Sequence, residues 1–103
     1  FENTIQLYYY QSNHEGDLID YLHRFGFDEV GFCFNPGAYA HTSIALADAI
    51  EAIKAPVIEV HISNIYTREL FRSRSYLSKA AVDQVIGKGL DGYRLGILRL
   101  LSI

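Results

Sequence analysis

This chain of 103 residues has little of several residue types, and each scarcity excludes a class of protein. It contains no Trp, no Met, two Pro and a single Cys. One thiol cannot form an intrachain disulfide, so the chain is not a small secreted domain held together by disulfides. Cys33 lies within an apolar run, which indicates a small core residue. The sparing use of cysteine fits a cytoplasmic protein.

Positive charge and long apolar runs are scarce as well. Nine Lys and Arg are outnumbered by 12 Asp and Glu, for a net charge of −3, so we expect no nucleic-acid partner. No apolar run approaches the ~20 residues needed to cross a bilayer, so we expect no membrane contact. His14, His41 and His61 follow no helical metal-ligand spacing, and we expect no metal site.

Apolar residues make up 50% of the chain, enough to bury the core of a single domain spanning residues 1–103. Strand patterns alternate with helical ones and with short turns. The predicted strands cover residues 5–10, 30–34, 57–62 and 80–86, and helices begin near Ser12 or Asn13, near Thr42 or Ser43, and at Leu90. This order predicts an α/β fold with a parallel sheet covered by helices on both faces.

The third predicted strand carries charged side chains that its packing does not require. Side chains alternate along a strand, so Glu59 and His61 lie on the same face, roughly 7 Å apart along the backbone. A carboxylate beside an imidazole fixes the tautomer of the ring and favours its charged form, which suits a general acid. Taken alone, this stretch is equally consistent with a structural ion pair at the end of a core strand.

Polar residues also follow the other predicted strands. Residues 12–14 follow the first strand, residues 35–41 follow the second, and His61, Ser63 and Asn64 end the third. In open α/β sheets, ligands bind beyond the carboxyl ends of the strands. We therefore predict a small-molecule site at this edge of the sheet.

The residue types at this edge favour a hydroxylated, anionic substrate. Asn35 offers a donor and an acceptor, and Gly37 lets a ligand approach the backbone. Backbone amides near Ile62 and Ser63 can bind a carboxylate. Arg72, nine residues beyond Ser63, can fold over a bound anion.

Several segments together resemble a known family, the type II 3-dehydroquinate dehydratases, over nearly all of the chain. The matching segments are Gln11-Ser12-Asn13-His14-Glu15-Gly16, Asn35-Pro36-Gly37-Ala38-Tyr39-Ala40-His41-Thr42-Ser43, Glu59-Val60-His61-Ile62-Ser63-Asn64-Ile65, Arg68-Glu69, Phe71-Arg72, Ser75-Tyr76-Leu77-Ser78 and Gly92-Tyr93-Arg94-Leu95. The resemblance implies a flavodoxin-like three-layer α/β/α fold. It implies a lyase of the shikimate pathway of aromatic amino acid biosynthesis. Such a lyase dehydrates 3-dehydroquinate to 3-dehydroshikimate by anti elimination through an enolate, without metal or cofactor.

The resemblance also implies roles for individual residues. His61 would protonate the departing hydroxyl, Glu59 would orient His61, and Asn35 would bind substrate and help to stabilise the enolate. The remaining substrate contacts would come from His41, Ile62, Ser63 and Arg72, and Asp48 would reach the site of a neighbouring subunit. The implied assembly is a trimer-based homo-dodecamer in the cytoplasm.

The sequence departs from the family pattern at its beginning. The family opens with a strand, an Asn-rich turn and a lid that carries an Arg and a Tyr base, and residues 1–103 contain no counterpart. We therefore expect a first β-α unit outside this sequence, with residues 1–103 forming the C-terminal portion of the domain. Without that base the chain would hold the acid and binding half of the site. The alternative is a non-catalytic, truncated α/β binding or assembly domain of the same fold.

Overall fold

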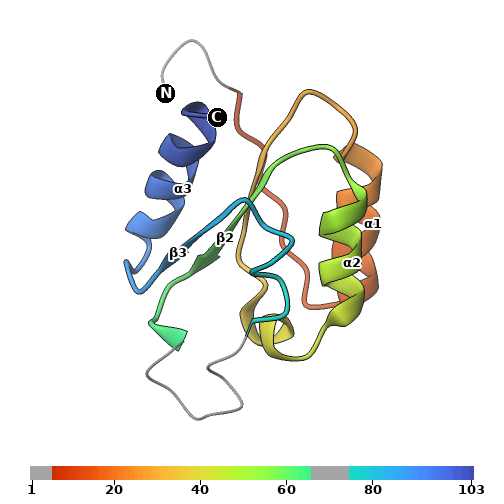
Figure 1. Cartoon of the computed structure of the whole chain (residues 1–103), viewed down its shortest axis with the longest axis horizontal. Helices are drawn as coiled ribbons and strands as arrows, with labels where there is room; N and C mark the ends of the chain where they lie inside the picture. The colour runs from red at the N-terminus through yellow and green to blue at the C-terminus, as the bar shows by residue number, and fades with distance from the viewer. Residues whose placement is uncertain (1–5, 66–74) are drawn as a thin grey trace.

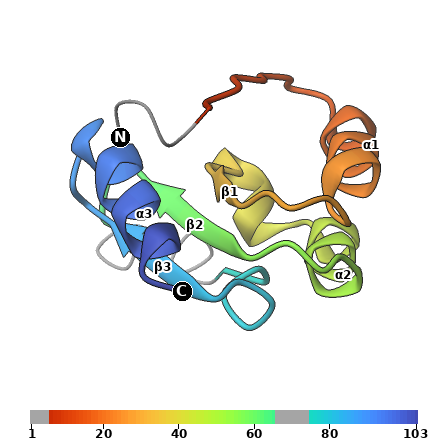
Figure 2. The same cartoon turned by 90° about the horizontal axis from the view of Figure 1, so that it is seen from above.

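The computed structural model describes residues 6–65 and 75–103, which form a parallel sheet with helices on both sides (Figure 1). The elements in chain order are α1 (Glu15–Phe25), β1 (Phe32–Phe34), the 3-10 helix η1 (Gly37–His41), α2 (Ile44–Ala52), β2 (Val57–His61), β3 (Asp83–Ile86) and α3 (Asp91–Leu101). The strands lie in the order β1-β2-β3, and both pairs are parallel. Helix α3 lies on one side of the sheet and α1 and α2 lie on the other (Figure 2). This arrangement confirms the predicted α/β/α architecture.

The main core lies between the sheet and the α1–α2 pair. Helix α2 presents Leu46, Ala49 and Ile50 at helical spacing, and all three are buried, as their periodicity predicts. They pack with Leu22 of α1 and Val57 of β2 in one apolar cluster. Burying each of the Leu, Ile and Val side chains in this cluster stabilises the fold by about 1.5–3 kcal/mol. This cluster fixes the position of β2 relative to α2.

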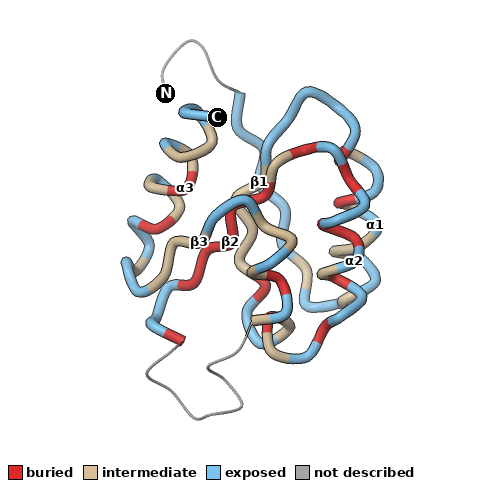
Figure 3. Tube along the Cα trace, viewed as in Figure 1, coloured by how far each residue is buried: buried red, intermediate tan, exposed pale blue. Residues whose placement is uncertain are grey.

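The opposite face of the sheet packs against α3 at close range. A Cβ atom added at Gly96 would lie 2.9 Å from Sγ of Cys33 and within 3.5 Å of side-chain atoms of Val60 and Ile58. Glycine at this position therefore allows the helix to approach β1 and β2. The strand β2 is buried along its whole length because both of its faces are covered (Figure 3).

Two features of the sheet differ from the prediction. The predicted strand at residues 5–10 is not formed, since residues 6–10 are exposed and have no regular structure; Ile5 lies outside the described residues. A strand requires a neighbouring backbone to complete its hydrogen bonds, and this segment runs apart from the sheet (Figure 2). The strand predicted at 80–86 begins at Asp83, because the amides of Ala80 and Ala81 bond to the Leu77 carbonyl in a turn.

The helix starts also distinguish between the predicted caps. Ser43 caps α2, and its hydroxyl accepts the Leu46 amide at 2.9 Å. The N-cap position of α1 is His14, one residue after Asn13 and two after Ser12, so neither predicted residue caps this helix. Within the two described ranges, none of the helices combines the length and apolar character needed to cross a membrane.

Candidate active site

Glu59 and His61 form a buried pair at the carboxyl end of β2. The Nε2 atom of His61 lies 2.5 Å from Oε2 of Glu59. The exposed fraction is 0% for Glu59 and 4% for His61. The alternation of side chains along the strand predicted that they share a face, and the contact confirms it. Because both side chains are buried, solvent has little access to the contact between them.

Two further side chains donate to the Glu59 carboxylate. The hydroxyl of Ser75 donates to Oε2 at 2.5 Å, and the amide of Gln84 donates to Oε1 at 2.9 Å. Burial alone would raise the pKa of Glu59. Hydrogen bonds from His61, Ser75 and Gln84, together with the charge of His61, lower that pKa below its ordinary value. The carboxylate is therefore ionised near neutral pH.

An ionised Glu59 determines which ring nitrogen of His61 carries a proton. An ionised carboxylate has no proton to donate and acts as an acceptor, so the Nε2 atom of His61 carries the proton of this bond. The other ring nitrogen, Nδ1, is the one that can exchange a proton with a ligand. A histidine held in this way by a carboxylate is suited to general acid–base chemistry.

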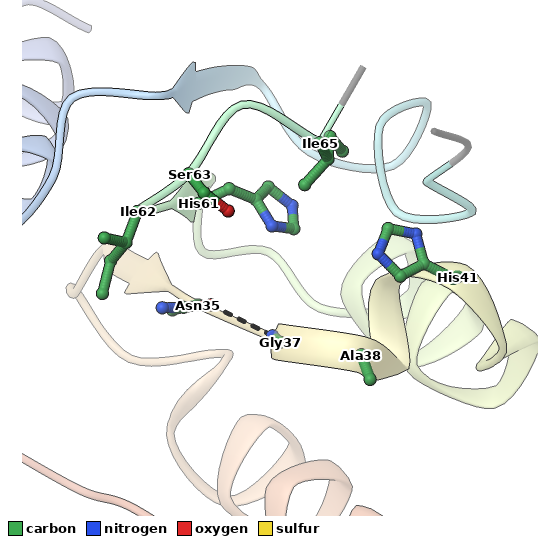
Figure 4. Close-up of a pocket in the computed structure, with 8 residues that line it drawn as sticks. All are labelled: Asn35, Gly37, Ala38, His41, His61, Ile62, Ser63 and Ile65. Atoms are coloured by element: carbon green, nitrogen blue, oxygen red, sulfur yellow. Dashed lines mark hydrogen bonds between the residues drawn. The ribbon is translucent and has the colours of Figure 1, made fainter. Parts of the chain in front are cut away.

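A cavity of about 170 Å³ lies in front of the pair (Figure 4). Its walls come from the end of β1, from η1 and from the segment that follows β2. The lining residues are Asn35, Gly37, Ala38, His41, His61, Ile62, Ser63 and Ile65. The rings of His61 and His41 extend from different elements into the same space (Figure 4). The lining is rich in polar groups, which suits a small hydroxylated ligand.

The side chain of Asn35 is held in one orientation at the cavity wall. Its Oδ1 atom accepts the Gly37 amide at 3.0 Å, and its Nδ2 atom donates to the hydroxyl of Tyr93 at 3.1 Å. Gly37 has a φ of 59°, which favours glycine and allows the chain to turn into η1. The second hydrogen of the Asn35 amide group can therefore be presented to a ligand.

The segment after β2 is anchored to the loop after β3. The carbonyl of His61 accepts the Gly87 amide at 3.1 Å, and the carbonyl of Ile62 accepts the Gly89 amide at 3.0 Å. These bonds fix the backbone that carries the Ser63 hydroxyl. Ile62 and Ser63 are exposed at the cavity edge, where a ligand can reach their backbone.

Most of the predicted site residues lie at this cavity. Asn35, Gly37, His41, His61, Ile62 and Ser63 line it, and Glu59 lies behind His61. Asp48 is exposed on α2 and does not line the cavity, and Arg72 lies outside the described residues. Residues 12–14, which were expected at the same edge, do not line it either.

Sequence reasoning did not assign roles to three of the side chains that support the site: Ser75, Gln84 and Tyr93. Gln84 carried a usable signal, since it is a polar residue inside an apolar strand. It is also the Cα partner of Glu59 between β2 and β3. Tyr93 gave no comparable signal, because an aromatic residue on a core-facing helix is expected without any role at a site.

Other reactive groups in the described chain offer little alternative chemistry. Burial raises the pKa of the Cys33 thiol to about 11, so it remains protonated and is a poor nucleophile. In residues 6–65 and 75–103, no three His, Cys, Asp or Glu side chains come together as a set that could hold a metal ion.

Comparison with known proteins identifies relatives across nearly the whole chain. The family model described as dehydroquinase class II matches residues 1–101. A 3-dehydroquinate dehydratase of Anoxybacillus flavithermus is 53% identical over 102 residues, covering 99% of this chain and 69% of the relative. A 3-dehydroquinate dehydratase of Bacillus subtilis is 49% identical over 98 residues, covering 95% of this chain and 66% of the relative.

Solved structures show the same fold. A type II dehydroquinase from Butyrivibrio crossotus superposes with a TM-score of 0.86 at 43% sequence identity, covering 90% of this chain and 66% of that one. A type II dehydroquinase from Propionibacterium acnes gives 0.85 at 39% identity, with 90% and 68% covered. The chain thus spans about two thirds of the length of the relatives it matches.

Proposed function

The chain belongs to the class II dehydroquinase family, and we propose that it acts as a hydro-lyase on 3-dehydroquinate, releasing water to give 3-dehydroshikimate. The observation that carries this proposal is the Glu59–His61 pair, with His61 lining a polar cavity. An elimination of water needs an acid that protonates the departing hydroxyl, and a histidine held by a carboxylate suits this role.

The elimination breaks two bonds of the substrate. A base removes a proton from the carbon next to the ketone, which gives an enolate. The electron pair of the enolate then expels the hydroxyl from the neighbouring carbon, and a new carbon–carbon double bond forms. Hydroxide is a poor leaving group, so His61 donates the Nδ1 proton as the C–O bond breaks, and water leaves. The ionised Glu59 stabilises the imidazolium that precedes this step.

Polar groups at the cavity wall supply the binding half of the reaction. The Asn35 amide is placed to bind substrate and stabilise the enolate, and His41 is placed to bind a hydroxyl. The backbone at Ile62 and Ser63, with the Ser63 hydroxyl, is placed to hold the substrate carboxylate, and Arg72 would add to this binding. The described cavity lining contains no tyrosine, the residue type that the family resemblance implies for the base.

The proposal extends to the assembly and the location of the protein. Asp48 is exposed on α2, where it is available to a neighbouring subunit, and this supports a trimer-based homo-oligomer. The cytoplasmic location is what the family resemblance implies. Light scattering after size exclusion measures the subunit number. A strictly monomeric protein would contradict this part of the proposal without affecting the chemistry proposed for His61.

The proposed acid is tested by His61→Ala, with His23→Ala as a matched control on the exposed end of α1. The product carries a conjugated ketone, so its formation can be followed by ultraviolet absorbance. We expect His61→Ala to abolish turnover and His23→Ala to preserve it, with circular dichroism and oligomeric state unchanged in both. Near-normal turnover in His61→Ala would refute the acid role.

A second candidate is a non-catalytic binding or assembly domain of the same fold. It is favoured by the absence of a tyrosine from the described lining of the cavity. Isothermal titration of the 103-residue chain with 3-dehydroshikimate, together with a turnover assay on 3-dehydroquinate, separates the two candidates. Binding without turnover would support the second candidate for this chain, and turnover would exclude it.

A further inference from the structure

The Glu59 carboxylate receives more donors than a simple ion pair would require. Its exposed fraction is 0%, and His61, Ser75 and Gln84 all donate to it, at 2.5, 2.5 and 2.9 Å. Of these three residues, His61 lines the cavity, whereas Ser75 and Gln84 do not. The two outer donors therefore act on the carboxylate and not on a ligand.

We propose that Ser75 and Gln84 are positioning residues for the acid, which keep Glu59 ionised and oriented so that His61 carries the proton delivered to the leaving hydroxyl. This inference rests on the acid role proposed for His61 and deepens it. Both residues act through Glu59 without contact with the substrate.

The physical reason lies in where the proton of the pair resides. A fully buried carboxylate tends to take up a proton, because burial penalises its charge. If Glu59 took the proton from Nε2, the imidazole would become neutral, and a neutral imidazole is a far weaker acid than an imidazolium. The hydrogen bonds from Ser75 and Gln84 both lower the pKa of Glu59, and so they keep the carboxylate ionised as the acceptor of the Nε2 proton.

The backbone fixes each of the two donors. Gln84 is the Cα partner of Glu59 in the parallel pairing of β2 and β3, so the strand register places its amide beside the carboxylate. The Ser75 hydroxyl oxygen accepts the Leu77 amide at 3.2 Å, which leaves its single hydrogen for Glu59. Leu77 is fully buried in the core, so the orientation of the hydroxyl is tied to a rigid part of the fold.

The experiment compares Ser75→Ala and Gln84→Met with the control Ser78→Ala. Ser78 lies in the same turn and donates to the Ser75 carbonyl at 3.1 Å, without contact with Glu59. We expect kcat to fall roughly tenfold in Ser75→Ala and in Gln84→Met, while KM changes little. The pH below which kcat is lost should move upward in these two variants. Ser78→Ala and the hydroxyl-preserving Ser75→Thr should both remain close to the wild-type protein.

A readout that does not require turnover keeps this inference separate from the proposed function. The titration of the Glu59 carboxyl carbon can be followed by ¹³C NMR, and its midpoint should rise in Ser75→Ala and Gln84→Met relative to wild type and Ser78→Ala. Equal midpoints in all four proteins would overturn the inference. Absence of turnover in the wild-type chain would count against the proposed function instead. If Ser75→Ala fails to fold, Gln84→Met carries the test, because methionine preserves the shape of the side chain.

Discussion

Replacing Tyr93 by Phe tests whether α3 takes part in the site. Tyr93 is half-buried on the helix, and its hydroxyl accepts the Asn35 amide at 3.1 Å. The substitution removes this acceptor and keeps the aromatic ring. The Gly37 amide still holds the other end of the Asn35 side chain at 3.0 Å. We therefore expect the side-chain amide of Asn35 to be less firmly oriented, while the cavity keeps its shape.

The size of the effect follows from the loss of one hydrogen bond. Such a bond contributes about 0.5–1.5 kcal/mol net, and a change of 1.4 kcal/mol is tenfold in affinity. The Kd for 3-dehydroshikimate should accordingly rise about two- to thirteenfold. The free energy of unfolding should fall by no more than about 1 kcal/mol, since the Asn35 amide lies at the cavity wall and can bond to water instead.

Isothermal titration with 3-dehydroshikimate measures the affinity, and thermal unfolding measures the stability. The matched control is Tyr21→Phe on α1, where the ring stacks on Tyr10 with centroids 4.1 Å apart and does not line the cavity. Unchanged affinity in Tyr93→Phe would refute the idea that this hydroxyl orients Asn35. An equal loss in both variants would refute it too, because the effect would then not be specific to the site.

Two further predictions concern stability. Because the pKa of Glu59 is lowered in the folded state, its ionised form stabilises the fold above the unfolded pKa of ~4.3, and this contribution is lost as pH falls through the lower folded pKa. Urea unfolding of Glu59→Gln should therefore show a smaller loss of stability below about pH 5 than wild type; parallel pH curves would contradict this. Ser43→Ala should lose about 1–2 kcal/mol in the same assay, because Ser43 caps α2 and donates to Glu15. Thr42→Ala, at an exposed neighbour, should lose less than about 0.5 kcal/mol.

Much of the fold was predictable because local patterns and burial agree. The apolar stripe of α2 is the clearest case, since Leu46, Ala49 and Ile50 are buried where their spacing places them. The segment at residues 5–10 was not predictable in the same way. Its aromatic residues favour a strand, but a strand forms only when another backbone completes its ladder, and local sequence does not contain that information. Strand ends were misplaced for the same reason, as at Asp83.

The site, like the fold, has a part that the sequence predicted and a part that it did not. Residues at the ends of β1 and β2 were predicted to converge, because parallel strands present their carboxyl ends at one edge, and the cavity confirms that Asn35, His41 and His61 do. The donors to Glu59 and Asn35 were not predicted, because they come from distant parts of the chain. Gln84 is the partner of Glu59 on the neighbouring strand β3, and Tyr93 reaches Asn35 from helix α3. Such contacts depend on tertiary packing.

The geometry of the Glu59–His61 pair bears on the two interpretations that the sequence left open, and it supports the proposed acid. A purely structural ion pair would be satisfied at both ends, with each partner surrounded by protein. Here the two ends differ: the carboxylate accepts from three side chains, whereas the imidazole ring lines the cavity on its other side. Burying a charge in this way is costly unless its partners are arranged in advance. This asymmetry suits the proposed proton donor, because the counter-charge of Glu59 is held in the core while the His61 ring lines the cavity.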